Sequence, residues 1–420
     1  MDENPSGRRE ERRSQPPWLN RIIVGTSLTS LFSDMSHETA TAMLPLFVAT
    51  LVGGPIAAAA PIGLIEGASD GASSAIKSYS GYWTDKTGKR TSIMYLGYAL
   101  TGFLIPAIGF AISWFQILAL RVAGWMGRGA RGPPRDALMS ESVTPKTRGK
   151  AFGFQRAFDT IGATIGIALA YLLVPRLPLP SIFFLTVIPG IASVVVVVTL
   201  VRARTRSARP EQPSFQAAVK GLSPRFKLFL VGVGLFGMVN FSNTIFNLRA
   251  LEILAPSLGQ TSAAELAFLL LLVLNVVYAA SSYPAGFLAD RVPKRYLLAS
   301  GYVIFGLACF ASVFEVPSIS ILLAIFVLGG LSTGIVDAVE GSYTAEFLES
   351  SQRGVGYGVL QTVNGVGDFV SSALIGVLIS FVSPAFGFGS FAVLSGAAAV
   401  VLLALTRPLQ GGGLAHVLNQ

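Results

Sequence analysis

Long apolar runs separated by short polar segments dominate the pattern along the chain. Most of these runs approach or exceed the roughly 20 residues that a helix needs to cross about 30 Å of hydrocarbon. Because only a helix satisfies its own backbone in lipid without a partner strand, the pattern predicts an all-α integral membrane protein. Its 12 transmembrane helices are expected at 20–49, 57–80, 93–113, 115–140, 150–174, 181–201, 227–251, 263–286, 297–314, 319–344, 356–381 and 386–406.

The second half of the chain repeats motifs of the first half at a fixed offset. Segment 81–90 returns at 286–295, which lies 205 residues further on, and Arg148-Gly149 returns as Arg353-Gly354 at the same offset. Two pairs at one offset indicate an internal duplication of about half the chain. Parallel repeats of this kind predict two six-helix halves in the same orientation, related by a pseudo-twofold axis along the membrane normal.

The repeated segment also carries a family resemblance. Residues 81–90 read Gly-Tyr-Trp-Thr-Asp-Lys-Thr-Gly-Lys-Arg between the second and third spans. This pattern resembles the signature loop of the major facilitator superfamily, here of the bacterial 12-span type. The copy at 286–295 has Pro293 where the family prefers Gly, so only its Asp and basic residues carry over. Span count, repeat and loop positions extend the resemblance over the whole chain.

The resemblance implies a secondary transporter and a gating role for this motif. It implies that Asp85 faces span eleven and that Gly81 lets helices approach closely. The gating residues are expected to be Gly81, Asp85, Lys86, Gly88, Lys89, Arg90, Gly286, Asp290 and Arg291.

Composition agrees with a membrane protein. The chain has 420 residues, is 52% hydrophobic and has a mean hydropathy of +0.62. Only 13% of its residues are charged, against about 25% in a typical soluble domain. The net charge of +9 does not indicate nucleic acid, because the basic residues cluster in loops between apolar runs. The single cysteine, Cys309, lies inside an apolar run and excludes an intrachain disulfide.

Lysine and arginine also predict the orientation. The first twenty residues are polar and Arg-rich and lack an apolar signal core, so we expect a cytoplasmic tail. Loops on the tail's side are rich in Lys and Arg, whereas the opposite loops offer only Arg176 and Arg249. This asymmetry predicts a multi-pass plasma membrane protein with both termini in the cytoplasm, expected to be a monomer. The predicted parts are a tail at 1–19, halves at 20–201 and 227–406, a linker at 202–226 and a tail at 407–420.

Many charged residues fall inside the predicted spans. Each costs about 2.5–3.5 kcal/mol or more at mid-membrane, so it is expected to face a partner or a water-filled cavity. The first half supplies both signs on different helices, whereas the second half supplies amides and carboxyls. The substrate-cavity candidates are His37, Glu66, Asp70, Arg128, Arg131, Arg156, Asp159, Asn240, Asn243, Asn247, Asp337, Glu340, Asn364 and Asp368.

Three residues are candidates for proton coupling. Asp34 and Glu38 lie where drug/proton antiporters of the family keep a first-span carboxyl, and Arg121 lies where the family carries its span-four Arg. Burial disfavours the charged form of a carboxyl, which suits it to carry a proton. The alternatives are a fixed ion pair of the carboxyls with Arg128 or Arg156, and a packing role for Arg121.

One motif of the family is incomplete. Antiporters carry Gly-x-x-x-Gly-Pro in span five, whereas this chain has Gly162 and Gly166 without the proline. The spacing predicts close helix packing and leaves antiport open.

No enzyme motif is present. The sequence has no Walker loop, His-Glu-x-x-His, cysteine cluster or Gly-x-Ser-x-Gly elbow, so neither a catalytic site, a metal nor a cofactor is expected. The prediction is a transporter with alternating access, coupled to protons by its buried carboxyls. Arginine binds carboxylates in bidentate fashion, which favours an anionic or zwitterionic solute such as a carboxylate metabolite or siderophore. The alternatives are efflux of cationic amphiphilic drugs and a non-transporting receptor or scaffold on the same fold.

Overall fold

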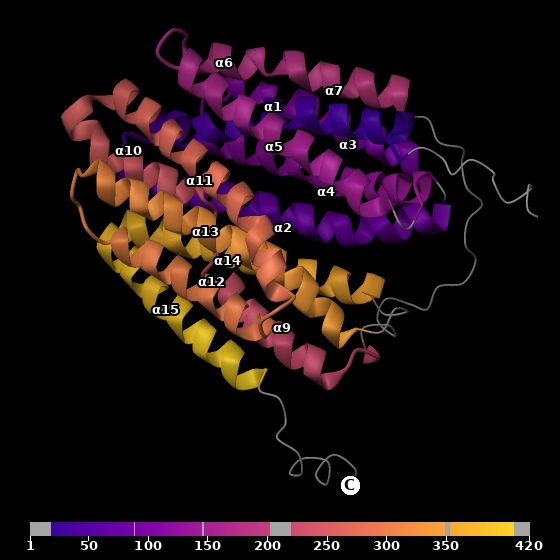
Figure 1. Ribbon diagram of the computed structural model, residues 1–420. Helices are drawn as coiled ribbons and strands as arrows, with labels where there is room; N and C mark the ends of the chain where they lie inside the picture. The colour runs from indigo at the N-terminus through magenta and orange to yellow at the C-terminus, as the bar shows by residue number, and fades with distance from the viewer. Residues whose placement is uncertain (1–17, 88, 145–146, 202–219, 349–352, 407–420) are drawn as a thin grey trace, which may run out of the picture.

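The protein is a bundle of long helices (Figure 1). The computed structural model describes residues 18–87, 89–144, 147–201, 220–348 and 353–406. The first half contains α1 (Arg21–Val52), α2 (Pro55–Thr87), α3 (Arg90–Leu104), η1 (Pro106–Phe110), α4 (Trp114–Ser142), α5 (Arg148–Leu173), α6 (Leu179–Leu185) and α7 (Val187–Leu200). The second half contains α9 (Pro224–Gly237), α10 (Thr244–Leu258), α11 (Gln260–Ala289), α12 (Lys294–Ala311), α13 (Ile319–Thr344), η3 (Ala345–Phe347), α14 (Arg353–Phe381) and α15 (Pro384–Leu405). The predicted all-helical fold is confirmed.

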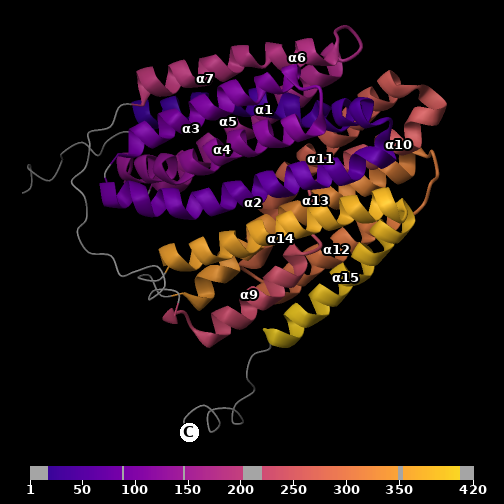
Figure 2. The same cartoon turned by 180° about the vertical axis from the view of Figure 1, so that it is seen from behind.

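The helices of each half pack mainly with one another. In both views the indigo-to-magenta helices of the first half lie on one side and the orange-to-yellow helices on the other (Figures 1 and 2). The halves meet where α2 packs along α14 and where α5 packs against α11. We call the end of the bundle near Lys89, Arg148 and Arg291 the basic end. The opposite end contains Gly53, between α1 and α2, and Ser383, between α14 and α15.

Several helices have too many polar residues to look membrane-spanning by composition. Among the described residues, seven helical segments are long and apolar enough to cross a membrane. Helices α1, α2 and α4 are not among these segments although they have 32, 33 and 29 residues. These three helices contain most of the charged candidates of the first half, so the polar residues that define the site also lower their hydropathy.

Span seven differs from its prediction. A continuous helix over 227–251 is wrong, because α9 ends at Gly237 and α10 begins at Thr244. Asn and Ser side chains compete for backbone hydrogen bonds and disfavour helix interiors, and residues 240–243 contain three of them. Helix α14 supplies partners instead, because Ser371 donates to the Asn240 carbonyl at 3.0 Å and the Ser242 amide donates to Ser372 at 3.1 Å. Asn240 therefore lies outside the helix that contains Asn247, whereas Asn243 is the residue at which that helix begins.

Glycines set the closest helix contacts. A Cβ added at Gly162 would overlap the backbone of Leu31, and one at Gly166 would come within 2.9 Å of the Met35 carbonyl. The close packing predicted for these two glycines is confirmed, with α1 as the partner helix. A Cβ at Gly81 would meet only Pro133 at 3.6 Å, an ordinary contact, so the close approach expected there is not required.

The tightest contact between the halves lies at another glycine. A Cβ at Gly63 of α2 would overlap the carbonyl oxygen of Ser372 and come within 3.2 Å of the Gly376 Cα on α14. Nearby, Ser380 of α14 donates to the Ile56 carbonyl at 2.7 Å and accepts from the Ala60 amide at 2.9 Å. Helices α2 and α14 are thus in backbone contact toward the opposite end of the bundle.

Candidate functional site

Four helices bring the charged residues of the first half together. Helix α4 presents its arginines to α1 and α2, and α5 adds polar side chains from the far side of α1. On a helix, residues three or four positions apart lie on one face, which is why each helix contributes a row of polar groups. The resulting cluster has cationic and anionic members that pair between helices.

Arg121 of α4 is held by Glu66 of α2. Its Nη2 lies 3.0 Å from Glu66 Oε1, and its Nη1 donates to Thr41 of α1 at 2.9 Å. The side chains are only 1% and 4% exposed. Glu66 therefore pairs across helices, with α4 rather than with a residue of its own helix. This buried pair joins α1, α2 and α4.

Trp125 forms the centre of the cluster. The Arg121 guanidinium carbon lies 3.5 Å from its ring centroid, and that of Arg128 lies 5.3 Å away. The indole nitrogen donates to Asp70 at 3.0 Å, which ties α4 to α2 a second time. The His37 ring meets the indole edge-on with a centroid separation of 5.3 Å. One buried indole therefore contacts two cations, a carboxyl group and an imidazole.

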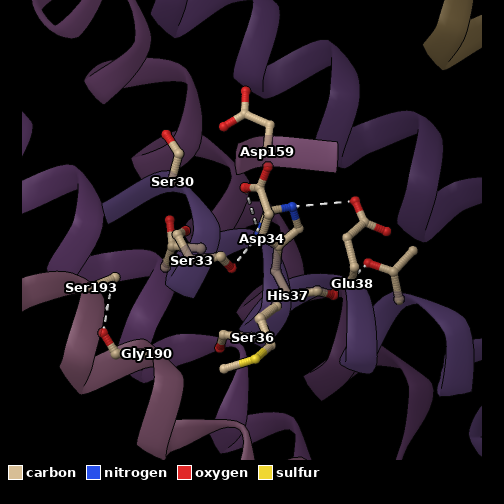
Figure 3. Close-up of polar contacts among 12 residues, drawn as sticks. Ser30, Ser33, Asp34, Ser36, His37, Glu38, Asp159, Gly190 and Ser193 are labelled. Atoms are coloured by element: carbon tan, nitrogen blue, oxygen red, sulfur yellow. Dashed lines mark hydrogen bonds and ion pairs between the residues drawn. The ribbon is translucent and has the colours of Figure 1, made fainter. Parts of the chain in front are cut away.

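Asp34, His37 and Glu38 lie next to one another on α1 (Figure 3). His37 Nδ1 lies 2.7 Å from the Ser33 carbonyl oxygen and 3.6 Å from Asp34 Oδ1, and its Nε2 lies 3.3 Å from Glu38 Oε1. Arg131 Nη2 is 3.9 Å from Asp34. The fixed ion pairs expected with Arg128 or Arg156 are therefore replaced by contacts with His37 and Arg131.

A bridge of three side chains joins the halves on the basic side of the bundle. Arg156 of α5 donates to Tyr278 of α11 at 2.9 Å, and Tyr278 donates to Asp337 of α13 at 3.0 Å. The Arg156 side chain is 66% exposed. Asp159, one turn along α5, accepts from Gln155 at 2.7 Å and lies 4.0 Å from Arg156.

The second half contributes uncharged partners to its carboxyls. Asn364 of α14 donates to Glu340 of α13 at 2.6 Å. Asn247 of α10 is buried and donates to the Ala42 carbonyl of α1 at 3.2 Å. Ser242, in the break of span seven, reaches Glu66 at 3.4 Å. Asp368 on α14 is partly buried.

Two cations of the cluster have no anionic partner at contact distance. Within the part of the chain that the structure describes, neither Arg128 nor Lys77 forms an ion pair or donates a hydrogen bond. Both are partly buried, and Lys77 lies within electrostatic range of Arg128, Asp70 and Asp368. Arg128 in turn lies within electrostatic range of Asp70, Asp34 and Glu38. An anion between the two cations could contact both of them directly.

The predicted gating residues lie at the basic end. The side chains of Asp85 and Lys86 and all of Gly88 lie outside the described residues, so the predicted contact of Asp85 with span eleven is not described. Arg90 pairs with Glu141 of α4 at 2.8 Å. Lys89 of the first copy is exposed. In the second copy Gly286 lies in the last turn of α11, Asp290 is exposed and Arg291 stacks on Phe287 at 4.0 Å.

Sequence analysis missed three residues of interest. Neither Trp125 nor Tyr278 is among the predicted site residues, and Arg249 was assigned to a loop. Arg249 lies instead within α10, 2% exposed, with Glu252 at 2.8 Å and the Ser312 carbonyl at 3.1 Å. The i, i+3 spacing of Arg249 and Glu252 is a helical signal. No sequence signal identifies Tyr278 as a bridge, because its partners lie on two other helices.

Comparisons with known proteins agree with this architecture. A family model described as Major Facilitator Superfamily matches residues 26–274 and 235–416. An uncharacterised MFS-type transporter of Methanocaldococcus jannaschii is 30% identical over 385 residues, which cover 90% of this chain and 94% of the relative.

Two further matches are more distant. The cis,cis-muconate transport protein of Acinetobacter baylyi is 25% identical over 321 residues, covering 74% of this chain and 76% of that protein. The crystal structure of the nucleoside transporter NupG matches with a TM-score of 0.77 at 12% identity, covering 92% of this chain and 99% of that one, and it shows the fold alone. This chain belongs to the major facilitator superfamily and is a multi-pass membrane transporter of a small molecule, not an enzyme.

Proposed function

We propose that this transporter moves a small organic anion, with a carboxylate as the recognised group, and couples its movement to protons. The observation that carries the proposal is the pair of cations Arg128 and Lys77, which lack a close anionic partner among the described residues. Arg121 and Arg131, in contrast, already contact Glu66 and Asp34. A guanidinium and an ammonium on neighbouring helices can hold one carboxylate, or the two ends of a dicarboxylate.

Two further observations support an anionic solute. The relative from Acinetobacter baylyi is described as a transport protein for cis,cis-muconate, a dicarboxylate. Trp125, beside Arg128, offers an apolar ring face next to the cation, and a conjugated or aromatic carboxylate could use both. Muconate is therefore the first solute to test.

The contacts between the halves support alternating access. Helices α2 and α14 touch through backbone atoms toward the opposite end, and the side-chain bridge Arg156–Tyr278–Asp337 joins α5 to α11 and α13 on the basic side. In the proposed cycle the α2–α14 contact opens when the Arg156–Tyr278–Asp337 bridge closes. Lys and Arg distribution in the loops supports cytoplasmic termini in the plasma membrane, and a monomer is sufficient for the cycle.

A cationic amphiphile is the second candidate. Asp337, Glu340 and Asp368 bring three carboxyls from α13 and α14, and Glu340 receives a hydrogen bond from an uncharged amide. If these carboxyls are ionised during transport, they favour a cation over an anion. The same assay distinguishes the two classes of solute.

We expect Arg128→Gln to reduce uptake of labelled cis,cis-muconate into proteoliposomes by about tenfold or more, since a charged hydrogen bond contributes about 1.5–3 kcal/mol. Uptake would be measured with an imposed proton gradient. Lys150→Gln, which removes an exposed cation at the start of α5, is the matched control and should transport like the parent protein.

Three outcomes would contradict parts of the proposal. Uptake of a lipophilic cation such as tetraphenylphosphonium in place of muconate would favour the cationic solute. Equal muconate uptake by the parent and Arg128→Gln would remove Arg128 from the site. No flux of either solute, with no binding of either, would favour a receptor or scaffold role.

A further inference from the structure

The imidazole of His37 is fixed in place by its surroundings. The side chain is 0% exposed and packs edge-on against Trp125. Its Nδ1 lies 2.7 Å from the backbone carbonyl of Ser33, and its buried Nε2 has no conventional hydrogen bond among the described residues. The atom that Nε2 faces is Glu38 Oε1 at 3.3 Å (Figure 3).

The carbonyl contact determines where one imidazole proton lies. A backbone carbonyl oxygen can only accept, so Nδ1 must be the donor in a contact of 2.7 Å. The nearby Asp34 oxygen, at 3.6 Å from Nδ1, also suits a donor at that nitrogen. A neutral His37 therefore carries its proton on Nδ1 and turns an unprotonated Nε2 toward Glu38.

The contact between Nε2 of His37 and Glu38 requires one further proton. If Nε2 is unprotonated and Glu38 is ionised, the nitrogen lone pair faces a carboxylate oxygen with no hydrogen between them. Two buried acceptors in contact without a donor are unfavourable. One proton between the two atoms removes the conflict, either as an O–H bond of Glu38 that donates to Nε2 or as an Nε2–H bond that donates to the carboxylate. The pair thus holds one proton in both arrangements.

The two members differ in access to solvent. The Glu38 side chain is 26% exposed, whereas that of His37 is buried. Glu38 can therefore exchange the proton with water, while His37 stays in place as its partner. On uptake a proton from water forms the new O–H or N–H bond, and on release the same bond breaks and the proton returns to water.

Other charges surround the pair from each neighbouring helix. Asp34 lies on α1 itself, Arg121, Arg128 and Arg131 face it from α4, and Asp159 from α5. Glu66 and Asp70 complete the group from α2. Asp34, the other carboxyl candidate on α1, has Arg131 at 3.9 Å as a charged partner, whereas the contact of Glu38 is with His37.

We propose that His37 and Glu38 together form the proton-binding site of this transporter, with Glu38 exchanging a single shared proton with solvent. The proposal rests on the proton coupling proposed above and names the atoms involved. It assigns His37, placed from the sequence among the substrate-cavity candidates, a direct part in coupling.

Nuclear magnetic resonance of the imidazole tests the site without any substrate. The chain has 2 histidines, so a His416→Gln variant labelled with ¹⁵N-histidine reports His37 alone. We expect the neutral ring to carry its proton on Nδ1. We also expect the ¹⁵N shifts of His37 and the ¹³C carboxyl shift of Glu38 to change in the same pH steps, because one shared proton makes the titration a property of the pair. Glu38→Gln identifies the Glu38 carboxyl signal by difference.

Transport provides the functional readout. In proteoliposomes, Glu38→Gln is expected to lower the ratio of gradient-driven uptake to counter-flow of muconate by about tenfold or more. Lys150→Gln serves as the control. A neutral ring protonated on Nε2, or independent titrations of His37 and Glu38, would overturn the shared-proton site. Absence of muconate flux in the parent would instead count against the proposed solute, whereas the imidazole spectrum would still test the shared-proton site.

Discussion

Replacing Glu66 with alanine is expected to destabilise the folded protein by about 3–5 kcal/mol, because it leaves a buried guanidinium without its counterion. Arg121 is 1% exposed, and Glu66 is its charged partner at 3.0 Å. The loss would be measured as a shift in the unfolding midpoint of the purified protein in a mild detergent with denaturant. The thermal midpoint should fall in parallel.

Two variants show whether the charge is the cause. Asp136→Ala breaks a similar pair with Arg135, but Asp136 is 48% exposed, so a cost within about 1 kcal/mol is expected. The double variant Glu66→Met with Arg121→Met removes both charges and should recover much of the stability, as happens when apolar side chains replace a buried ion pair. Equal destabilisation of the single and double variants would show that packing, rather than the unpaired charge, explains the loss.

Gly63→Ala is expected to disfavour the conformation in which α2 and α14 touch. The new Cβ would overlap the Ser372 carbonyl, and overpacking of this kind costs about 1–3 kcal/mol. Since the cost applies only while the two helices are in contact, the population of that conformation should fall about 5- to 150-fold relative to the open one.

Spin labels on the two helices can measure this shift. Ile56 on α2 and Val382 after α14 are 46% and 60% exposed and lie near the contact. Because Cys309 is the single cysteine, one further substitution, Cys309→Ser, gives a background for labelling both positions. The distance distribution should move to longer values in Gly63→Ala and stay unchanged in Gly81→Ala, where the added Cβ makes an ordinary contact. An unchanged distribution in Gly63→Ala would refute the idea that this contact closes one side.

Hydrophobic pattern and repeat predicted the fold well, because the bilayer imposes helices of known length on the chain. The break in span seven was not predicted, since the apolar runs on either side of Asn240, Ser242 and Asn243 were read as one span. The partners that satisfy the backbone there, Ser371 and Ser372, come from α14. Arg249 was counted with the opposite loops although it fell near the end of the predicted helix 227–251, because span boundaries read from sequence are uncertain by several residues. The structure places it inside α10.

The candidate site was predictable as a set of residue types rather than as contacts. Helical spacing placed Asp34, His37 and Glu38 on neighbouring positions, but spacing does not give the rotation of a helix about its axis. The choice of Glu66 for Arg121, and of Asp70 for Trp125, depends on that rotation. Which cations remain without a close anion followed only from the assembled helices.

The charges within α1, α2 and α4 have a consequence for biosynthesis. An arginine at the centre of an isolated helix costs about 2.5–3.5 kcal/mol to insert from the translocon, and α4 carries Arg121, Arg128 and Arg131 in its middle turns. Helix α4 therefore enters the lipid unfavourably as a single segment. Its counterions Glu66 and Asp34 are synthesised earlier, on α2 and α1, so these helices must still be near the lateral gate when α4 arrives. Assembly of the site and insertion of the first four spans are one event.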